Sequence, residues 1–405
     1  MPVKWLEKNA HVLQTLESRS SLKDLEPLRE MIGSASIVGL GEAAHGTHEI
    51  FKIKHRFVEF LVSEMGFTNL VLEENWGSAL RLDHYVLTGE GDLSGILNPV
   101  FNTREVTDML EWVRSYNADP RHEEKVRIIG MDIQQVDESV YNKITDYIRP
   151  RRPDLLPVVT ETTKALLPDT KDISLFSSLS KEDKDRRITE AQEIRKILEQ
   201  NKEDLGGQAN EFQWVLQSAR IIEQFTTMAA VLAEQPSEFF LKHDIAMFEN
   251  AKWTQENLGR TIVWAHNGHI SKENLIPFVY PKVSGQHLAE YYQEKYVTIG
   301  TSVYQGKYNA YNSQNDFGPH GTLQSNPDSI NYTLGQVRKE LFFVDLRKAG
   351  GLTKAWLEES HPFFAGVTAV GPDIPTTVDI PLGSLFDILI QIRKVTPSQL
   401  IRQYD

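Results

Sequence analysis

Histidine and glutamate side chains gather in three short segments, each of which follows an apolar run. Glu42 and His45 come after SASIVGLG, Glu73 and Glu74 follow TNLVL, and His266 and His269 follow RTIVWA. Successive residues of a strand point to opposite faces, so we expect only one of Glu73 and Glu74 to reach a given side. A histidine can take a proton from water near neutral pH, and a neighbouring carboxylate can fix its tautomer and stabilise the imidazolium that forms. These residue types predict hydrolysis by an activated water molecule.

The same side chains also suit a metal site. Two or three histidines with two carboxylates bind divalent transition metals such as Mn, Fe, Co or Zn, and a metal-bound water would then be the nucleophile. A protein that binds a ligand in the same cleft without converting it is a third possibility. The sequence favours a general base without a cofactor, because a histidine flanked by glutamate can do this chemistry alone.

The glycines around the first segment resemble a phosphate-binding loop only at first sight. The third glycine, Gly46, comes two places too late for G-x-G-x-x-G, and Glu42 would face a pyrophosphate with a negative charge. The sequence also has no P-loop, no G-x-S-x-G elbow and no H-E-x-x-H motif. We therefore expect these glycines to let the chain turn sharply, so that Glu42 and His45 face a cleft.

Apolar runs alternate with helical patterns along most of the chain. The expected strands are SASIVGLG, TNLVLEEN, VRIIGMDIQ, RTIVWAHNGHI, YVTIGTSVY, LFFVDLR and FDILIQIRKV. The expected helices include 1–34, 49–65 with Gly66 at its end, WGSALRLDHYVLTG, and FNTREVTDMLEWVRSYN with Asn102 as its N-cap. This alternation predicts an α/β fold with a mostly parallel central sheet flanked by helices. Ligands bind outside the carboxyl ends of such strands, where the histidines and glutamates fall.

Residues 137–258 lack a strand pattern. They contain long helical patterns, of which two are closed by Gly206 and Gly259, and the prolines of RPRRPDLLPVV mark one edge. We expect an all-helical insertion over the C-terminal strand ends, which could act as a lid, within an α/β catalytic domain formed by 1–136 and 259–405. A helical appendage for packing or dimerisation is the alternative.

Composition narrows the class of protein. The 405 residues are 40% hydrophobic and 24% charged, as in globular proteins, and the net charge of -13 argues against nucleic acid as a partner. The absence of cysteine excludes disulfides and thiolate metal sites. No stretch is long and apolar enough for a membrane helix, and MPVKWLEKNA has no signal-peptide core, so we expect a cytoplasmic protein. The sequence contains no feature that indicates the oligomeric state.

Taken in order, these segments resemble the erythromycin esterase family. The matching pieces are VGLGEAAHGTHEIFKIKHRFVEFLVSEMGF, LVLEENWGSALRLDHYVLTG, LEWVRSYN, RIIGMDIQ, KHDIAMFENAKW and VWAHNGHI. The resemblance implies a carboxylic ester hydrolase that opens a macrolide lactone and so confers antibiotic resistance. It places the family's catalytic glutamates at Glu42 and Glu73, its histidine pair at His266 and His269, and its general base at His45.

Further charged and aromatic residues lie outside this set of five. Lys54 stands where macrolide-active members can have arginine, and no role carries over to it. Asp132 could orient a catalytic histidine or cap the turn that follows it. We expect His48, His55 and His84 to lie at the surface or in helix packing, and the tryptophans at 76, 112, 214, 253 and 264 to serve the core. Some family members are linked to polysaccharide biosynthesis, so the resemblance indicates a hydrolase more firmly than a macrolide substrate.

Overall fold

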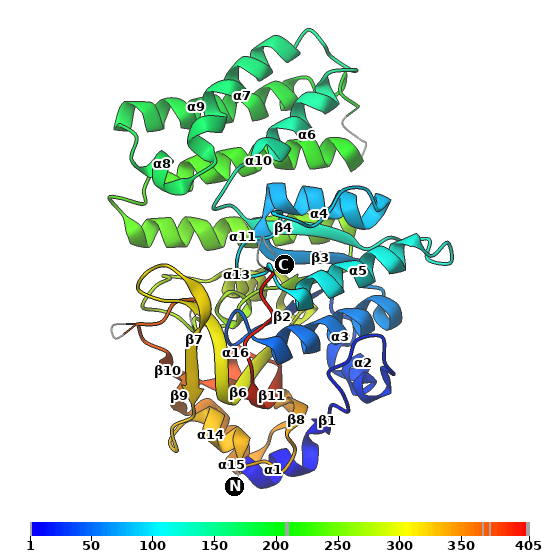
Figure 1. Cartoon of the computed structure of the whole chain (residues 1–405), viewed down its shortest axis with the longest axis vertical. Helices are drawn as coiled ribbons and strands as arrows, with labels where there is room; N and C mark the ends of the chain where they lie inside the picture. Colours follow the sequence, from blue (N-terminus) through cyan, green and yellow to red (C-terminus); the bar gives the residue numbers. More distant parts are fainter. Residues whose placement is uncertain (1, 207–209, 367, 372–373, 402–405) are drawn as a thin grey trace.

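A nine-stranded sheet forms the centre of the molecule (Figure 1). The computed structural model describes residues 2–206, 210–366, 368–371 and 374–401. The strand order is β1 (His11–Val12), β8 (Leu341–Asp345), β11 (Ile388–Val395), β6 (Tyr296–Tyr311), β2 (Ile37–Leu40), β5 (Thr261–Trp264), β3 (Asn69–Asn75) and β4 (Arg127–Asp132), and β7 (Phe317–Gln324) pairs with β6. A separate hairpin joins β9 (Ser360–Phe364) and β10 (Thr377–Pro381).

Strands from β11 to β4 pair in parallel, whereas β8, β1 and β7 pair antiparallel with their neighbours. The mixed α/β fold with a mostly parallel sheet is therefore confirmed. Alternate residues feed two hydrophobic cores: Val71 and Val263 join the core on one face, and Leu70 and Ile262 join the core on the other. Burial of both faces explains why these strands read as continuous apolar runs.

Helices cover both faces of the sheet. The helices of the strand–helix units are α3 (His48–Met65), α4 (Trp76–Thr88) and α5 (Arg104–Ala118), and the later ones include α12 (Asn267–Ile270), α13 (Ser284–Tyr292), α14 (Ile330–Gly335), α15 (Gly351–Glu358) and α16 (Leu382–Leu385). Gly66 follows α3 in the left-handed conformation with φ +70°, as expected for a helix end. No helix in the described ranges is long and apolar enough to cross a membrane.

Several expected boundaries were wrong. Residues 1–34 hold α1 (Pro2–Asn9), β1, a 3-10 turn at Lys23–Leu25 and α2 (Pro27–Ile32) instead of one long helix, because β1 adds to the sheet beside β8. Thr103, not Asn102, caps α5 and accepts a hydrogen bond from the backbone of Val106. β7 was not expected, since FGPHGTLQ has weak strand propensity and forms a strand only through its pairing with β6.

Residues 138–258 hold α6 (Glu138–Ile148), α7 (Leu156–Thr170), α8 (Ile173–Ser177), α9 (Lys181–Gln200), α10 (Asn210–Ala229) and α11 (Pro236–Leu258), with no strand among the described residues. Gly259 ends α11 as expected, but α9 stops well before Gly206. The upper part of Figure 1 shows α6–α10 beyond α4 and β4, with α11 between them and the sheet. The domain division and a lid role for this segment stay predictions.

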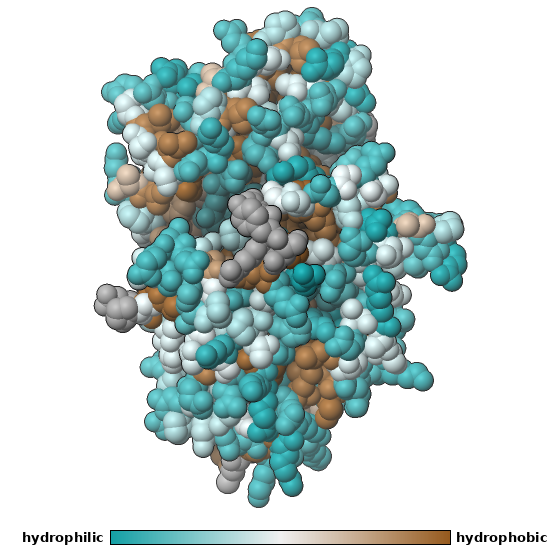
Figure 2. All heavy atoms as spheres, in the orientation of Figure 1, coloured by the Kyte–Doolittle hydropathy of each residue, from teal (hydrophilic) through white to brown (hydrophobic). Residues whose placement is uncertain are grey.

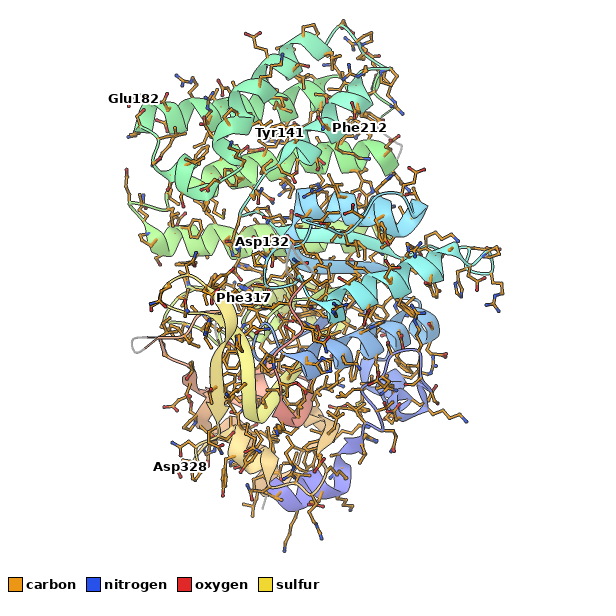
Figure 3. The ribbon with its side chains drawn as sticks, in the orientation of Figure 1. Asp132, Tyr141, Glu182, Phe212, Phe317 and Asp328 are labelled. Atoms are coloured by element: carbon orange, nitrogen blue, oxygen red, sulfur yellow. The ribbon has the colours of Figure 1, made fainter. Side chains whose placement is uncertain are left out.

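Apolar side chains fill the helical segment, whereas a charged side chain lies at its boundary with the sheet. Tyr141 and Phe212 lie inside the helical segment, whereas Asp132 lies beside α11 at the boundary with the sheet (Figure 3). Hydrophilic side chains cover most of the face shown in Figure 2, with smaller apolar patches between them. The apolar interior of the helical segment is continuous with the core on one face of the sheet, and the boundary between them includes a buried charge.

The glycines of the first segment have two different roles. Gly46 has φ +72° and needs the freedom of glycine for its turn, as expected. Gly39 and Gly41 are instead required by close approach: a Cβ on Gly41 would lie 2.2 Å from Oδ1 of Asn267, and one on Gly39 would lie 2.6 Å from the hydroxyl of Tyr296. The expectation of a sharp turn was wrong for these two positions.

Gly41→Ala should therefore lower the free energy of unfolding by about 1–3 kcal/mol. The added methyl would displace Asn267, whose amide accepts from the backbone N–H of Thr301 at 3.1 Å and donates to its carbonyl at 2.8 Å. Urea denaturation followed by circular dichroism measures the change. Gly350→Ala is the matched control, because a Cβ there meets nothing within 4 Å. Equal midpoints for the two variants would contradict the prediction.

Candidate active site

The residues singled out in the sequence meet at the carboxyl ends of three neighbouring strands. Glu42 and His45 lie in the loop between β2 and α3, Glu73 lies in β3, and His266 and His269 lie at α12, after β5. A cavity of about 560 Å³ has His45, Glu73, His266 and His269 in its wall, and Glu42 is fully buried behind them. The fold thus brings all five predicted residues together.

Only one of the two consecutive glutamates of β3 reaches this cavity, as the alternation of a strand requires. Glu73 accepts a hydrogen bond of 2.6 Å from the backbone N–H of His266. Glu74 is fully buried elsewhere and accepts from the backbone N–H groups of Asn75 and Asn98. Burial raises the pKa of Glu74 to about 7. Glu74 therefore has a structural role, because its hydrogen bonds hold the backbone at Asn75 and Asn98.

Glu42 links His45 to a buried lysine. One carboxylate oxygen contacts Nδ1 of His45, and the other accepts from Nζ of Lys54 at 2.7 Å and from Nε1 of Trp264 at 3.1 Å. Burial raises the pKa of Glu42, but the charges of Lys54 and His45 outweigh it and lower this pKa to about 2. Burial lowers the pKa of Lys54 to about 8. Glu42 is therefore an anion at neutral pH.

This anion fixes the state of His45. A neutral His45 ring must carry its proton on Nδ1, which faces the carboxylate, so its Nε2 is an unprotonated acceptor. Burial lowers the pKa of His45, but Glu73 and Glu42 outweigh burial and raise it above its ordinary value. The ring is 7% exposed and lines the cavity. His45 thus has the properties of a general base.

Glu73 stands between two histidines. Its Oε1 lies 3.9 Å from Nε2 of His45 and 3.5 Å from Nε2 of His269. Nδ1 of His269 contacts Oδ1 of Asp244 at 2.9 Å. Burial lowers the pKa of His269, but Asp244 and Glu73 outweigh it and raise this pKa. Because the charges of His45 and His269 repel each other, protonation of one disfavours protonation of the other.

His266 behaves differently from both. Its Nδ1 accepts a hydrogen bond of 3.0 Å from the backbone N–H of Gly268, and burial lowers the pKa of the ring to about 3. The ring is therefore neutral, with its proton on Nε2. That atom is buried with no hydrogen-bond partner of normal geometry among the described residues, and its ring centroid lies 5.0 Å from that of His45. His266 is a neutral donor beside the base.

Sequence reasoning missed two residues of α11. Asp244 contacts His269, and His243 lies between Asp244 and Asp132, with Nδ1–Oδ2 and Nε2–Oδ1 distances of 3.3 Å and 2.9 Å. Their signal was present, because KHDIAMFENAKW is one of the family-like segments. Asp132 accepts from the backbone N–H of Ile133 at 2.6 Å, as expected for a residue that caps the turn, and it also contacts His243, which is not one of the predicted catalytic histidines.

The remaining histidines take the packing or surface places expected of them. His48 contacts Glu105 at 2.5 Å, His55 is buried 3.3 Å from Glu59, and His84 is exposed. Of the five tryptophans, Trp76, Trp214 and Trp264 are buried in the core, and Trp112 and Trp253 are partly buried against it. Trp264 also supports the site through Glu42.

The donors of this cluster do not form a ready metal site. In the parts of the chain that the structure describes, no group of three or more His, Asp or Glu side chains is placed to hold a metal ion. The Nδ1 atoms of His45 and His269 face carboxylates, and that of His266 accepts a backbone hydrogen bond, which leaves the Nε2 atoms of His45 and His269 as the ring nitrogens that face Glu73.

Comparison with known proteins decides the family. The family model described as erythromycin esterase matches residues 62–395, which is most of the chain. The chain belongs to the erythromycin esterase family. Family membership indicates a hydrolase, and the mixed α/β fold agrees with it.

Relatives of this erythromycin esterase family member differ in their names. A solved structure of a Bacillus cereus protein is 60% identical and superposes with a TM-score of 0.97, covering 99% of this chain and 98% of the other. A solved succinoglycan biosynthesis protein is 36% identical with a TM-score of 0.92 and the same coverage. Erythromycin esterase type II of Escherichia coli is 22% identical over 70% of this chain and 72% of its own length.

The buried pair of Glu42 and Lys54 gives a test of the site's charge balance. Lys54→Met should lower the free energy of unfolding by about 3–5 kcal/mol, because it leaves a buried carboxylate without its cation. Glu42→Gln should cost a similar amount, and the double variant should recover much of the loss. Urea denaturation of all four proteins measures the coupling. If the losses of the two single variants add up to the loss of the double variant, Glu42 and Lys54 do not stabilise each other and the interpretation is wrong.

Proposed function

We propose that this protein is a carboxylic ester hydrolase in which His45 activates a water molecule for direct attack on the carbonyl carbon. The observation that carries the proposal is the His45 ring in the cavity wall, with Nδ1 held by the buried Glu42 anion. Glu73 beside Nε2 supplies an acceptor for the second hydrogen of the same water. The arrangement needs no nucleophile from the protein.

The reaction is a water-for-alcohol exchange. His45 Nε2 takes a proton from water while the water oxygen bonds to the carbonyl carbon, which gives a tetrahedral oxyanion. Glu42 stabilises the imidazolium that forms. Collapse of the intermediate then breaks the carbon–oxygen bond, and the imidazolium returns its proton to the departing alkoxide. One ester and one water give one acid and one alcohol, with His45 restored.

The oxyanion needs hydrogen-bond donors that are already in place. His269 suits this role when protonated, because Asp244 holds its Nδ1 and leaves Nε2 at the site. His266 also lies in the cavity wall, but its Nε2 is buried, so we assign it no role as a donor to the oxyanion. One proton shared between two coupled rings makes the active state one with neutral His45 and charged His269.

The walls of two adjoining cavities suggest a substrate with an apolar part on one side of its ester group and a more polar part on the other. Apolar side chains line most of the main cavity, including Phe240, Ile276, Phe278 and Val279. A second cavity of about 390 Å³ shares His45 and Glu73 with it and is lined in part by polar side chains, including Asn75, Asn98, Gln134 and Tyr311. A small-molecule ester or lactone could place its carbonyl where the two cavities join. The family and the Escherichia coli relative support a macrolide lactone as one such substrate.

His45→Ala should lower turnover by about 100- to 10,000-fold while the fold survives, because it removes only the base. A panel of macrolides and simple esters, read by mass spectrometry for the gain of one water, measures turnover. His84→Ala is the control, since His84 is an exposed histidine. Near-normal activity of His45→Ala would show that the base is wrong. Unchanged ligands with the wild type would favour a sequestering protein.

Activity should survive exhaustive chelation, because the Glu42–His45 pair can deprotonate water without a metal ion. Elemental analysis of the purified protein measures bound metal, and the same ester panel measures turnover before and after chelation. Loss of activity that one divalent transition metal restores would establish the metal-dependent hydrolase instead.

A further inference from the structure

Helix α11 sends two adjacent side chains out of the helical segment and into the edge of the site. His243 is 3% exposed and Asp244 is fully buried. Asp244 Oδ1 lies 2.9 Å from Nδ1 of His269 and also accepts a 2.7 Å hydrogen bond from the backbone N–H of Ser284, at the start of α13. The carboxylate is thereby fixed from two elements while it holds the histidine.

His243 in turn is held between two carboxylates. Its Nδ1 lies 3.3 Å from Asp244 and its Nε2 lies 2.9 Å from Asp132 at the end of β4. Burial lowers the pKa of His243, but the two aspartates outweigh it and raise the pKa to about 10. His243 therefore carries a positive charge at neutral pH, and its ring centroid lies 5.9 Å from that of His269.

We propose that Asp244 and His243 are positioning residues of the reaction: Asp244 orients His269 and favours its charged form, and His243 holds Asp244 and limits that effect. The proposal rests on the proposed ester hydrolysis. Helix α11 is then part of the site, because the contacts that link Asp132 of β4 to His269 pass through His243 and Asp244 on this helix. Asp244 is fully buried behind His269, whereas His243 lines the cavity.

The contacts of His269 define what can shift its protonation. The titratable groups that face this ring come from α11, β3, α12, the loop after β2 and the segment before α13: Asp244, His243, Glu73, His266, His45 and Tyr280. Asp244 and Glu73 favour the charged ring, and His243 opposes it. Removing Asp244 and removing His243 should therefore have opposite effects.

The test uses Asp244→Asn and His243→Gln in the full-length protein. If charged His269 is required, activity falls on the alkaline side as this ring loses its proton. Asp244→Asn removes a negative charge and should move the alkaline limb of kcat to lower pH, whereas His243→Gln removes a positive charge and should move it to higher pH. At the optimum, Asp244→Asn should lower kcat at least about 10-fold with little change in KM.

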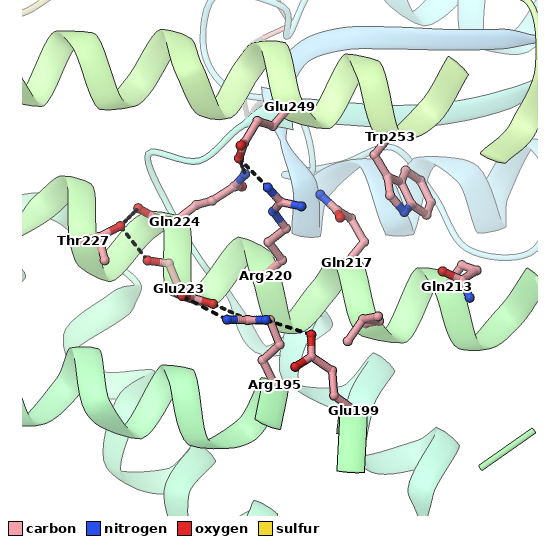
Figure 4. Close-up of a pocket in the computed structure, with 11 residues that line it drawn as sticks. Arg195, Glu199, Gln213, Gln217, Arg220, Glu223, Gln224, Thr227, Glu249 and Trp253 are labelled. Atoms are coloured by element: carbon pink, nitrogen blue, oxygen red, sulfur yellow. Dashed lines mark hydrogen bonds and ion pairs between the residues drawn. The ribbon is translucent and has the colours of Figure 1, made fainter. Parts of the chain in front are cut away.

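Glu249→Gln is the matched control on the same helix. Glu249 points from another part of α11 into a polar pocket of the helical segment, where it lies 2.9 Å from Arg220 and 3.1 Å from Gln224 (Figure 4). This change should leave the pH profile of ester hydrolysis where it is in the wild type. A shift in the control as large as that of Asp244→Asn would overturn the proposal, because it would reflect only disturbance of α11.

An NMR titration of the histidine side chains separates this proposal from the proposed function. The pKa of His269 should fall in Asp244→Asn and rise in His243→Gln, whether or not any ester is hydrolysed. Equal His269 titrations in all three proteins would overturn the link between α11 and His269. Opposite NMR shifts with an unmoved kcat profile would overturn the role in the reaction. A wild type that hydrolyses nothing, with opposite NMR shifts, would refute ester hydrolysis while supporting the link.

Discussion

The buried carboxylate of Glu42 is the constraint on which the site depends. An ion in the interior needs partners, because burial alone costs several kcal/mol. Lys54 and Trp264 satisfy one oxygen of this carboxylate, and the other is left for His45. That division sets the tautomer of His45 and presents its Nε2 to the cavity. A conventional ion pair in the core thus supports the proposed general base.

The same rule repeats across the site. Acids and bases alternate along one buried row: Lys54, Glu42, His45, Glu73, His269, Asp244, His243 and Asp132. Each anion lowers the cost of the cations on either side of it, so the row is stable only as a whole. His266 stands outside this row, and burial keeps its ring neutral. The site therefore holds three histidines close together in different states.

Membership in the erythromycin esterase family and the geometry of the site support each other at the level of a hydrolase. The names of the relatives range from an erythromycin esterase to a succinoglycan biosynthesis protein. Such a spread fits a supported base at the sheet edge with cavity walls that differ among members, because the chemistry depends on the buried row and the substrate depends on the walls. The walls here combine apolar side chains on one side with polar ones on the other.

The sequence by itself determined the parallel strands and the histidines and glutamates at their ends, because strand burial and strand-end position are local patterns that periodicity records. Alternation required that only one of Glu73 and Glu74 reach a given side, and the family resemblance indicated Glu73. Only the tertiary structure decided the partners. Lys54 meets Glu42 through the packing of α3, and His243 meets Asp132 across 111 residues of sequence through α11. Helical periodicity predicts which face of α11 is apolar. It cannot predict the role of His243 and Asp244, because that role depends on the strand and loop that they contact.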